Sequence, residues 1–92
     1  MSQEHILKTQ PAYYDAIKRG EKMFEVRRDD RGFQKGDILV LQRLNERWNP
    51  HEVETDINGV ARHEMRFRIK YILTGGQFGL APGYVVMQLE AE

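Results

Sequence analysis

Residues 64–73 show the clearest periodicity in this sequence, and it constrains the fold more than any other feature. Apolar and basic side chains alternate there, as they do along a β-strand with one buried face. We expect the basic face to be a solvated outer surface, because no aromatic residue is interleaved with its cations to stack bases. That face carries Arg66, Arg68 and Lys70, and the other carries Met65, Phe67, Ile69, Tyr71 and Leu73, of which the first four are predicted to lie in the core.

Only residues 10–19 have the periodicity of a helix. Thr9 or Gln10 can cap its start, and Pro11 suits the first turn, where its missing N–H costs nothing. Gly20 is a natural residue just beyond the end. The apolar stripe of this predicted helix consists of Tyr13, Tyr14, Ala16 and Ile17.

Short strands are predicted for the rest of the chain, over residues 5–8, 22–28, 37–43 and 84–89. Within them, Ile38–Leu41 is apolar on both faces, which indicates a central strand. One helix and about five to six short strands favour an α+β fold, a small β-barrel with the helix over one end. At 92 residues the whole chain, 1–92, is expected to be a single domain.

Two connecting segments carry predictions of their own. Residues 45–62 are the least regular part of the chain, and Asn58-Gly59 predicts a hairpin turn between weak strands over 53–57 and 60–63. Residues 75–83 form a glycine-rich loop whose Phe78 is expected to plug an end of the barrel, with a base-stacking platform as the alternative.

Composition excludes several classes of function. Lys and Arg number 14, as do Asp and Glu, and a neutral chain argues against non-specific binding of duplex nucleic acid. There is no cysteine, and none of the three histidines has the spacing of a metal ligand pair, so we expect no metal and no cofactor. No apolar stretch approaches the ~20 residues of a membrane span, and the polar start Met1–His5 does not look like a secretory signal. We therefore expect a cytoplasmic protein without membrane contact.

The most informative candidate site lies in residues 20–27. Phe24 and Val26 alternate as in a half-buried strand, which places Glu25 and Arg27 together on the opposite face. Lys22 precedes them, and Lys8 ends the first predicted strand just before the helix. The structural alternative is a solvated strand face with an ion pair of little energetic value. As a ligand site, Lys22 and Arg27 would bind a phosphate or carbonyl oxygen, and Glu25 would accept from a base amino group or hold Arg27 in place.

These residues also carry a resemblance. The spacing of Gly20, Lys22, Glu25 and Arg27, followed by Gly36-Asp37 and an apolar strand, resembles the ASCH domain (activating-signal-cointegrator homology) of the PUA-like superfamily. The resemblance extends from His5 to Leu89. Four further segments, 5–8, 28–31, 78–80 and 83–86, resemble a small branch found in bacteria and phages that has no assigned function. It implies a PUA-like barrel and a cleft, lined by Lys8, Lys22, Glu25 and Arg27, that binds RNA or a modified nucleoside.

Two other functions remain open. One ASCH-like branch hydrolyses N4-acetylcytidine with the motif lysine, a threonine three residues later and a distant glutamate. Lys22 matches that lysine, but Glu25 stands at the threonine position, so Lys22 and Glu25 are catalytic candidates only if the protein is an enzyme. The third hypothesis is a phage-encoded module that binds a protein partner, with Trp48 as its anchor.

Overall fold

The computed structural model describes residues 2–47 and 50–92, and it confirms a small α+β fold with one helix and five strands. The elements are β1 (Glu4–Thr9), α1 (Pro11–Lys18), β2 (Phe24–Arg28), β3 (Ile38–Arg43), β4 (Glu64–Thr74) and β5 (Tyr84–Ala91). Each predicted main element is present, and its bounds differ from the predicted ones by at most two residues. Within the described residues, no helix has the length and apolar character that crossing a membrane requires.

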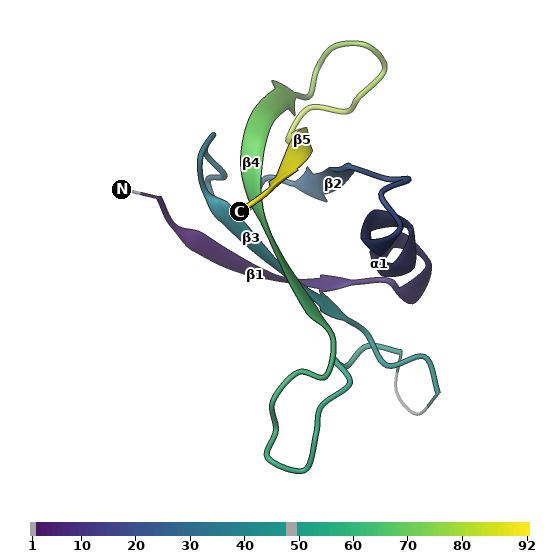
Figure 1. Cartoon of the computed structure of the whole chain (residues 1–92). Helices are drawn as coiled ribbons and strands as arrows, with labels where there is room; N and C mark the ends of the chain where they lie inside the picture. Colours follow the sequence, from purple (N-terminus) through teal and green to yellow (C-terminus); the bar gives the residue numbers. More distant parts are fainter. Residues whose placement is uncertain (1, 48–49) are drawn as a thin grey trace.

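The five strands form one curled sheet in the order β1-β3-β4-β5-β2 (Figure 1). β1 runs parallel to β3, and the other neighbouring pairs are antiparallel. β1 and β2 are therefore the two edges of the sheet, and the curl brings both of them beside α1 (Figure 1). The sheet is a half-barrel, and its open side is the natural place for a site.

The inner face of the curled sheet and the helix share one core. Buried residues alternate along β1 and β5, so each of these strands buries one face. In β3 the four consecutive residues Ile38–Leu41 are all buried, which confirms that this strand is covered on both faces. This core cluster consists of Leu7, Tyr14, Ile17, Phe33, Leu39, Leu41, Ile69, Val85, Met87 and Leu89.

Helix α1 begins and ends as the sequence predicts. Gln10 is its N-cap residue, although no side chain makes a capping hydrogen bond there, and Pro11 stands in the first turn. Gly20 has φ +79°, a conformation that costs glycine little, and its N–H donates to the carbonyl of Ile17 at 2.9 Å. Tyr13 differs from the prediction, because it is exposed and faces the open side of the sheet rather than the core.

A β-bulge in β4 corrects the prediction that Tyr71 is a core residue. Ile69 pairs with Leu89 and Tyr71 pairs with the preceding residue of β5, Gln88, so Lys70 is an extra residue on β4. The extra residue reverses the alternation from that point on. Tyr71 is consequently 58% exposed, whereas Ile72 packs against the core.

The segment between β3 and β4 contains less regular structure than predicted. The turn at Asn58-Gly59 is present, with Gly59 N–H donating to Asp56 and Asp56 N–H to Val60. The weak strands around it are reduced to isolated bridges, Leu44 with Val53 and Thr55 with Ala61, because few of their side chains reach the core. Trp48 lies outside the described residues.

Phe78 does not plug the barrel. It is 86% exposed, and it has φ +53° in a turn closed by a bond from Leu80 N–H to the Gln77 carbonyl. A turn that points the ring into solvent leaves it no contact with the core, so the predicted role as a plug was wrong.

Asp37 ties the start of β1 to the loop before β3. Its buried carboxylate accepts from His5 Nε2 at 2.9 Å and from the backbone N–H groups of Gln3 and Gln34 at 3.1 and 3.0 Å. Asp37 therefore has a structural role.

Candidate functional site

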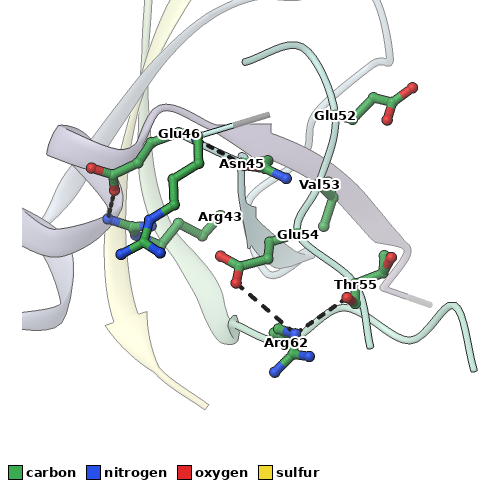
Figure 2. A pocket seen from close by; sticks show the side chains of 9 residues that line it. Arg43, Asn45, Glu46, Glu52, Val53, Glu54, Thr55 and Arg62 are labelled. Atoms are coloured by element: carbon green, nitrogen blue, oxygen red, sulfur yellow. Dashed lines mark hydrogen bonds and ion pairs between the residues drawn. The ribbon is translucent and has the colours of Figure 1, made fainter. Parts of the chain in front are cut away.

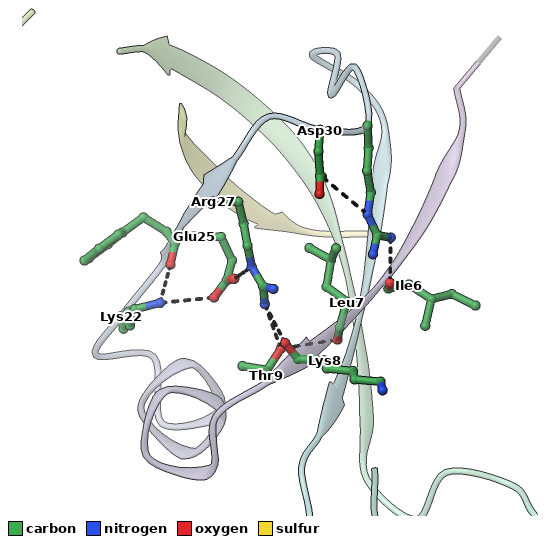
Figure 3. Close-up of polar contacts among 10 residues, drawn as sticks. Ile6, Leu7, Lys8, Thr9, Lys22, Glu25, Arg27 and Asp30 are labelled. Atoms are coloured by element: carbon green, nitrogen blue, oxygen red, sulfur yellow. Dashed lines mark hydrogen bonds and ion pairs between the residues drawn. The ribbon is translucent and has the colours of Figure 1, made fainter. Parts of the chain in front are cut away.

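A cleft of about 670 Å³ opens between the end of β1, the helix and the edge strand β2, and we call it the α1–β2 cleft. The four predicted site residues all line it. Figure 3 shows a chain of polar contacts running from Lys22 through Glu25 and Arg27 to Lys8 and Thr9. The residues that line the cleft are Lys8, Thr9, Gln10, Tyr13, Lys22, Phe24, Glu25, Val26, Arg27 and Leu44.

Strand β2 turns its charged face inward. Glu25 is only 3% exposed, whereas Phe24 and Val26 are exposed on the outer face. Glu25 and Arg27 do share one face, as the alternation predicts, but the expectation that Phe24 and Val26 cover the core was wrong. Glu25 can point inward because Lys22 and Arg27 neutralise its charge there. Inward-pointing charges also protect an edge strand from pairing with other chains.

Glu25 is the centre of a three-residue ion cluster. Its Oε1 lies 3.1 Å from Lys22 Nζ, and its Oε2 lies 2.8 Å from Arg27 Nε. A buried carboxylate needs such partners, because the loss of hydration must be offset by hydrogen bonds and opposite charge. Glu25 therefore fixes the positions of both cations at the wall of the cleft.

Lys22 is held between two aromatic rings. Its Nζ lies 5.1 Å from the centre of the Tyr13 ring and 4.9 Å from that of Phe24, distances typical of cation–π contacts. It also donates to the Phe24 carbonyl at 2.8 Å. The exposure of Tyr13 and Phe24 thus has a local cause, since their rings flank an ammonium group at the mouth of the cleft.

Arg27 bridges the two unpaired edges of the sheet. Its Nη2 donates to the Lys8 carbonyl of β1 at 2.8 Å (Figure 3). Arg31, in the loop after β2, donates to the Ile6 carbonyl at the same distance. Side chains thereby replace the backbone bonds that would close a barrel between β1 and β2. Arg27 has a structural function here in addition to any role in binding.

The cleft retains hydrogen-bond donors for a ligand. Within the described residues, Arg27 Nη1 has no partner, and Lys22 makes two hydrogen bonds although an ammonium has three donors. Lys8 adds a third cation at the rim, where its Nζ lies 3.5 Å from the His51 carbonyl. Three cations around one carboxylate, beside two aromatic rings, are suited to bind an anionic group attached to a flat ring system.

The sequence predicted the charged members of this site and missed the others. Thr9, Gln10 and Leu44 come from elements that the motif does not include. The helical spacing of Tyr13 places it in the apolar stripe of the helix, but the structure exposes its side chain at the cleft. The sequence contains no signal for its true position, since only the path of β2 decides which side of α1 faces the cleft.

A second cavity, of about 580 Å³, lies beside the β3–β4 connection (Figure 2). Two of its three arginines are already paired: Arg43 binds both oxygens of Asp15 at 3.0 Å and also Glu46, and Arg62 lies 3.9 Å from Glu54. The bond from Arg43 lowers the pKa of the Asp15 carboxyl. With equal numbers of arginines and glutamates, this cavity offers less to an anionic ligand than the α1–β2 cleft.

Metal-binding clusters of three or more His, Cys, Asp or Glu side chains do not occur in residues 2–47 and 50–92. The three histidines are spread along the chain, and His5 is paired with Asp37.

Comparison with known proteins gives a family without a known activity. The sequence model of a family described as a domain of unknown function (DUF3850) matches residues 4–89, which is nearly the whole chain. No curated protein matches the sequence. The matched range includes every residue that lines the α1–β2 cleft. Because the match covers nearly the whole chain, the chain belongs to the DUF3850 family.

Proposed function

We propose that this protein is a cytoplasmic domain of the ASCH, PUA-like type that binds single-stranded RNA or a nucleotide-like ligand in the α1–β2 cleft. The observation that carries the proposal is the cluster of Lys22, Glu25 and Arg27, with Lys8 at its rim, in a cleft flanked by two aromatic rings. The resemblance of the motif to ASCH domains supports the class of ligand.

The dimensions and chemistry of the cleft suit one nucleotide. Its volume of about 670 Å³ lies within the range of roughly 300–1,000 Å³ usual for small-molecule sites. The Arg27 fork and the Lys22 ammonium can bind phosphate or carbonyl oxygens, and the Tyr13 and Phe24 rings can contact a base. A chain of zero net charge gives little long-range attraction, so affinity has to come from a few contacts that converge in a confined site.

Replacing Arg27 with alanine is expected to weaken binding of nucleoside 5′-monophosphates about 5- to 150-fold, because losing a fork-like contact costs about 1–3 kcal/mol. Isothermal titration with the common ribonucleotides measures this. Arg31→Ala is the matched control, since it removes the same kind of bond to a β1 carbonyl but lies outside the cleft.

The controls separate binding from folding. Arg31→Ala and Arg68→Ala should leave mononucleotide affinity within about twofold. Thermal unfolding should show the larger loss of stability for Arg27→Ala, because that substitution also removes a partner of the buried Glu25 carboxylate, whereas Arg31→Ala removes no such partner. If Arg68→Ala weakens mononucleotide binding more than Arg27→Ala does, the ligand is on another surface and the proposal is wrong.

The amidohydrolase hypothesis leads to a separate expectation. Lys22 stands where the hydrolytic branch has its lysine, but it donates to Phe24 and to Glu25, and Glu25 occupies the position of the expected threonine. A lysine committed as a donor to two acceptors is poorly placed to abstract a proton. We therefore expect no multiple turnover of N4-acetylcytidine, measured as acetate release. Turnover that Lys22→Ala abolishes would establish the enzyme instead.

A further inference from the structure

The outer face of strands β4, β5 and β2 is a second surface, which shares Phe24 with the α1–β2 cleft. These three strands are neighbours in the sheet (Figure 1), and α1 packs on the opposite, inner side through Tyr14 and Ile17. We call the surface the outer sheet face and define it by Phe24, Arg28, Arg68, Lys70, Tyr71 and Tyr84. None of these side chains belongs to the core.

Three aromatic rings gather on this face through the strand register. Tyr71 and Phe24 both pair with Gln88, from opposite sides, so the two rings flank one residue of β5. Tyr84 pairs with Arg28 farther along the same strands. Phe24 and Tyr84 are 43% and 38% exposed, and Tyr71 is more exposed than either. Aromatic rings open to solvent on a sheet are a platform on which bases can stack.

The bulge at Lys70 creates the combination of charge and ring that a nucleic-acid surface needs. Without the extra residue, Tyr71 would point inward and the basic row of β4 would lack an aromatic neighbour. With it, both Lys70 and Tyr71 are exposed beside Arg68. A shallow groove of about 440 Å³ runs past these residues and is also lined by Lys35 and Gln88.

The cations of this face are available to a partner. Within the described residues, Arg28, Lys35, Arg68 and Lys70 form no ion pair, in contrast to the neighbouring Arg66, which is held by Glu4 and Glu92. Glu90, opposite Arg68, is the acidic group in the groove. In a chain with equal numbers of acidic and basic residues, a group of unpaired cations around exposed rings indicates a polyanion with flat bases rather than a protein surface.

We propose that the outer sheet face binds an extended single-stranded RNA, with bases stacked on Tyr71, Phe24 and Tyr84 and phosphates on Arg28, Arg68 and Lys70. This rests on the proposed function for its class of ligand and specifies that the ligand is a strand. Phe24 lines the α1–β2 cleft as well as the outer sheet face, so a strand can continue from one into the other.

The test compares ligands of two lengths, nucleoside monophosphates and a mixed-sequence RNA of about seven nucleotides, a length within the usual range for a small single-strand-binding domain. Tyr71→Ala is expected to weaken RNA binding roughly 5- to 150-fold, because one stacked base is lost. It should leave mononucleotide affinity unchanged. Lys70→Ala is expected to weaken RNA binding and to reduce the slope of log affinity against log salt concentration by about 1. Lys18→Ala is the matched control, an exposed lysine without an ion pair at the far end of α1.

The results distinguish this inference from the proposed function. If mononucleotides bind with Arg27 dependence but RNA binds no tighter, or if Tyr71→Ala has no effect on RNA, the outer sheet face is not the RNA surface. If Lys18→Ala weakens RNA binding as much as Lys70→Ala does, the attraction comes from any surface cation and the inference is overturned. A concentration-dependent dimer that Tyr71→Ala abolishes would assign the face to self-association instead. RNA binding that needs Tyr71 but not Arg27 would support this inference and contradict the proposed cleft.

Discussion

Replacing Asp37 with alanine is expected to lower the free energy of unfolding by about 3–5 kcal/mol, because each donor left without its acceptor costs about 1–3 kcal/mol. Three donors lose their acceptor at once: His5 Nε2 and the backbone N–H groups of Gln3 and Gln34. All three connect the start of β1 to the loop before β3, so β1 should detach most readily. Urea unfolding of the variant and the parent protein measures the difference.

Asp37→Asn is the matched control, because it keeps the shape and one acceptor oxygen. It should destabilise the protein less than Asp37→Ala does. Equal stability of Asp37→Ala and the parent protein would show that these bonds contribute nothing net to folding.

The same carboxylate predicts a dependence on pH. Desolvation alone would raise the pKa of Asp37, but the bonds from His5, Gln3 and Gln34 outweigh it, so the pKa is lowered from its usual value of 3.8. The unfolded chain then takes up the proton at higher pH than the folded protein does. The stability contributed by Asp37 is therefore fully present above pH about 4 and is lost as the pH falls through the folded pKa. Asp37→Asn should flatten this acid limb of a stability curve.

Gly75→Ala is expected to destabilise the protein by about 3 kcal/mol, the upper end for overpacking, because the added methyl group meets rigid backbone. A Cβ at this position would overlap the carbonyl oxygen of Ala81 and lie 2.8 Å from that of Tyr84. Gly75 N–H also donates to Tyr84 at 2.7 Å, so the chain cannot move away without losing a bond that joins β4 to β5.

Gly79→Ala in the same loop separates overlap from backbone strain. Gly79 has φ +78° and open space around it, so alanine there should cost about 1–2 kcal/mol, from conformation alone. Thermal unfolding of both variants tests the difference. Equal losses would mean that the loop adjusts to the methyl group and that the close approach at Gly75 has no structural importance.

Local patterns were sufficient to predict the fold class and the helix and strands that build it. The helix between Pro11 and Lys18 and the central strand β3 follow from periodicity, capping and an apolar run, all of which act over a few neighbouring residues. The alternation of β4 predicted its faces correctly as far as Ile69. It failed at Tyr71 because a bulge depends on the register with β5, a strand that the loop 75–83 separates from β4.

The site was predictable in its residues and not in its orientation. Alternation along β2 shows that Glu25 and Arg27 share a face, but it does not show which face is covered. The usual preference for burying apolar side chains points to Phe24 and Val26, and the structure buries Glu25 instead. Its partners decide this: Lys22 and Arg27 neutralise it locally, and Arg27 in turn finds a carbonyl of β1 that is distant in sequence.

The sequence by itself therefore determined the elements, the neutral charge and the charged members of the α1–β2 cleft, because these depend on residue type and short spacing. Only the tertiary structure decided that β1 and β2 are unpaired edges bridged by arginines, that Tyr13 and Phe24 flank Lys22, and that Tyr71 joins the cations of the outer sheet face. Each of these depends on which strands pair and in which register. Pairing is set by the burial of the whole core, and no local pattern contains it.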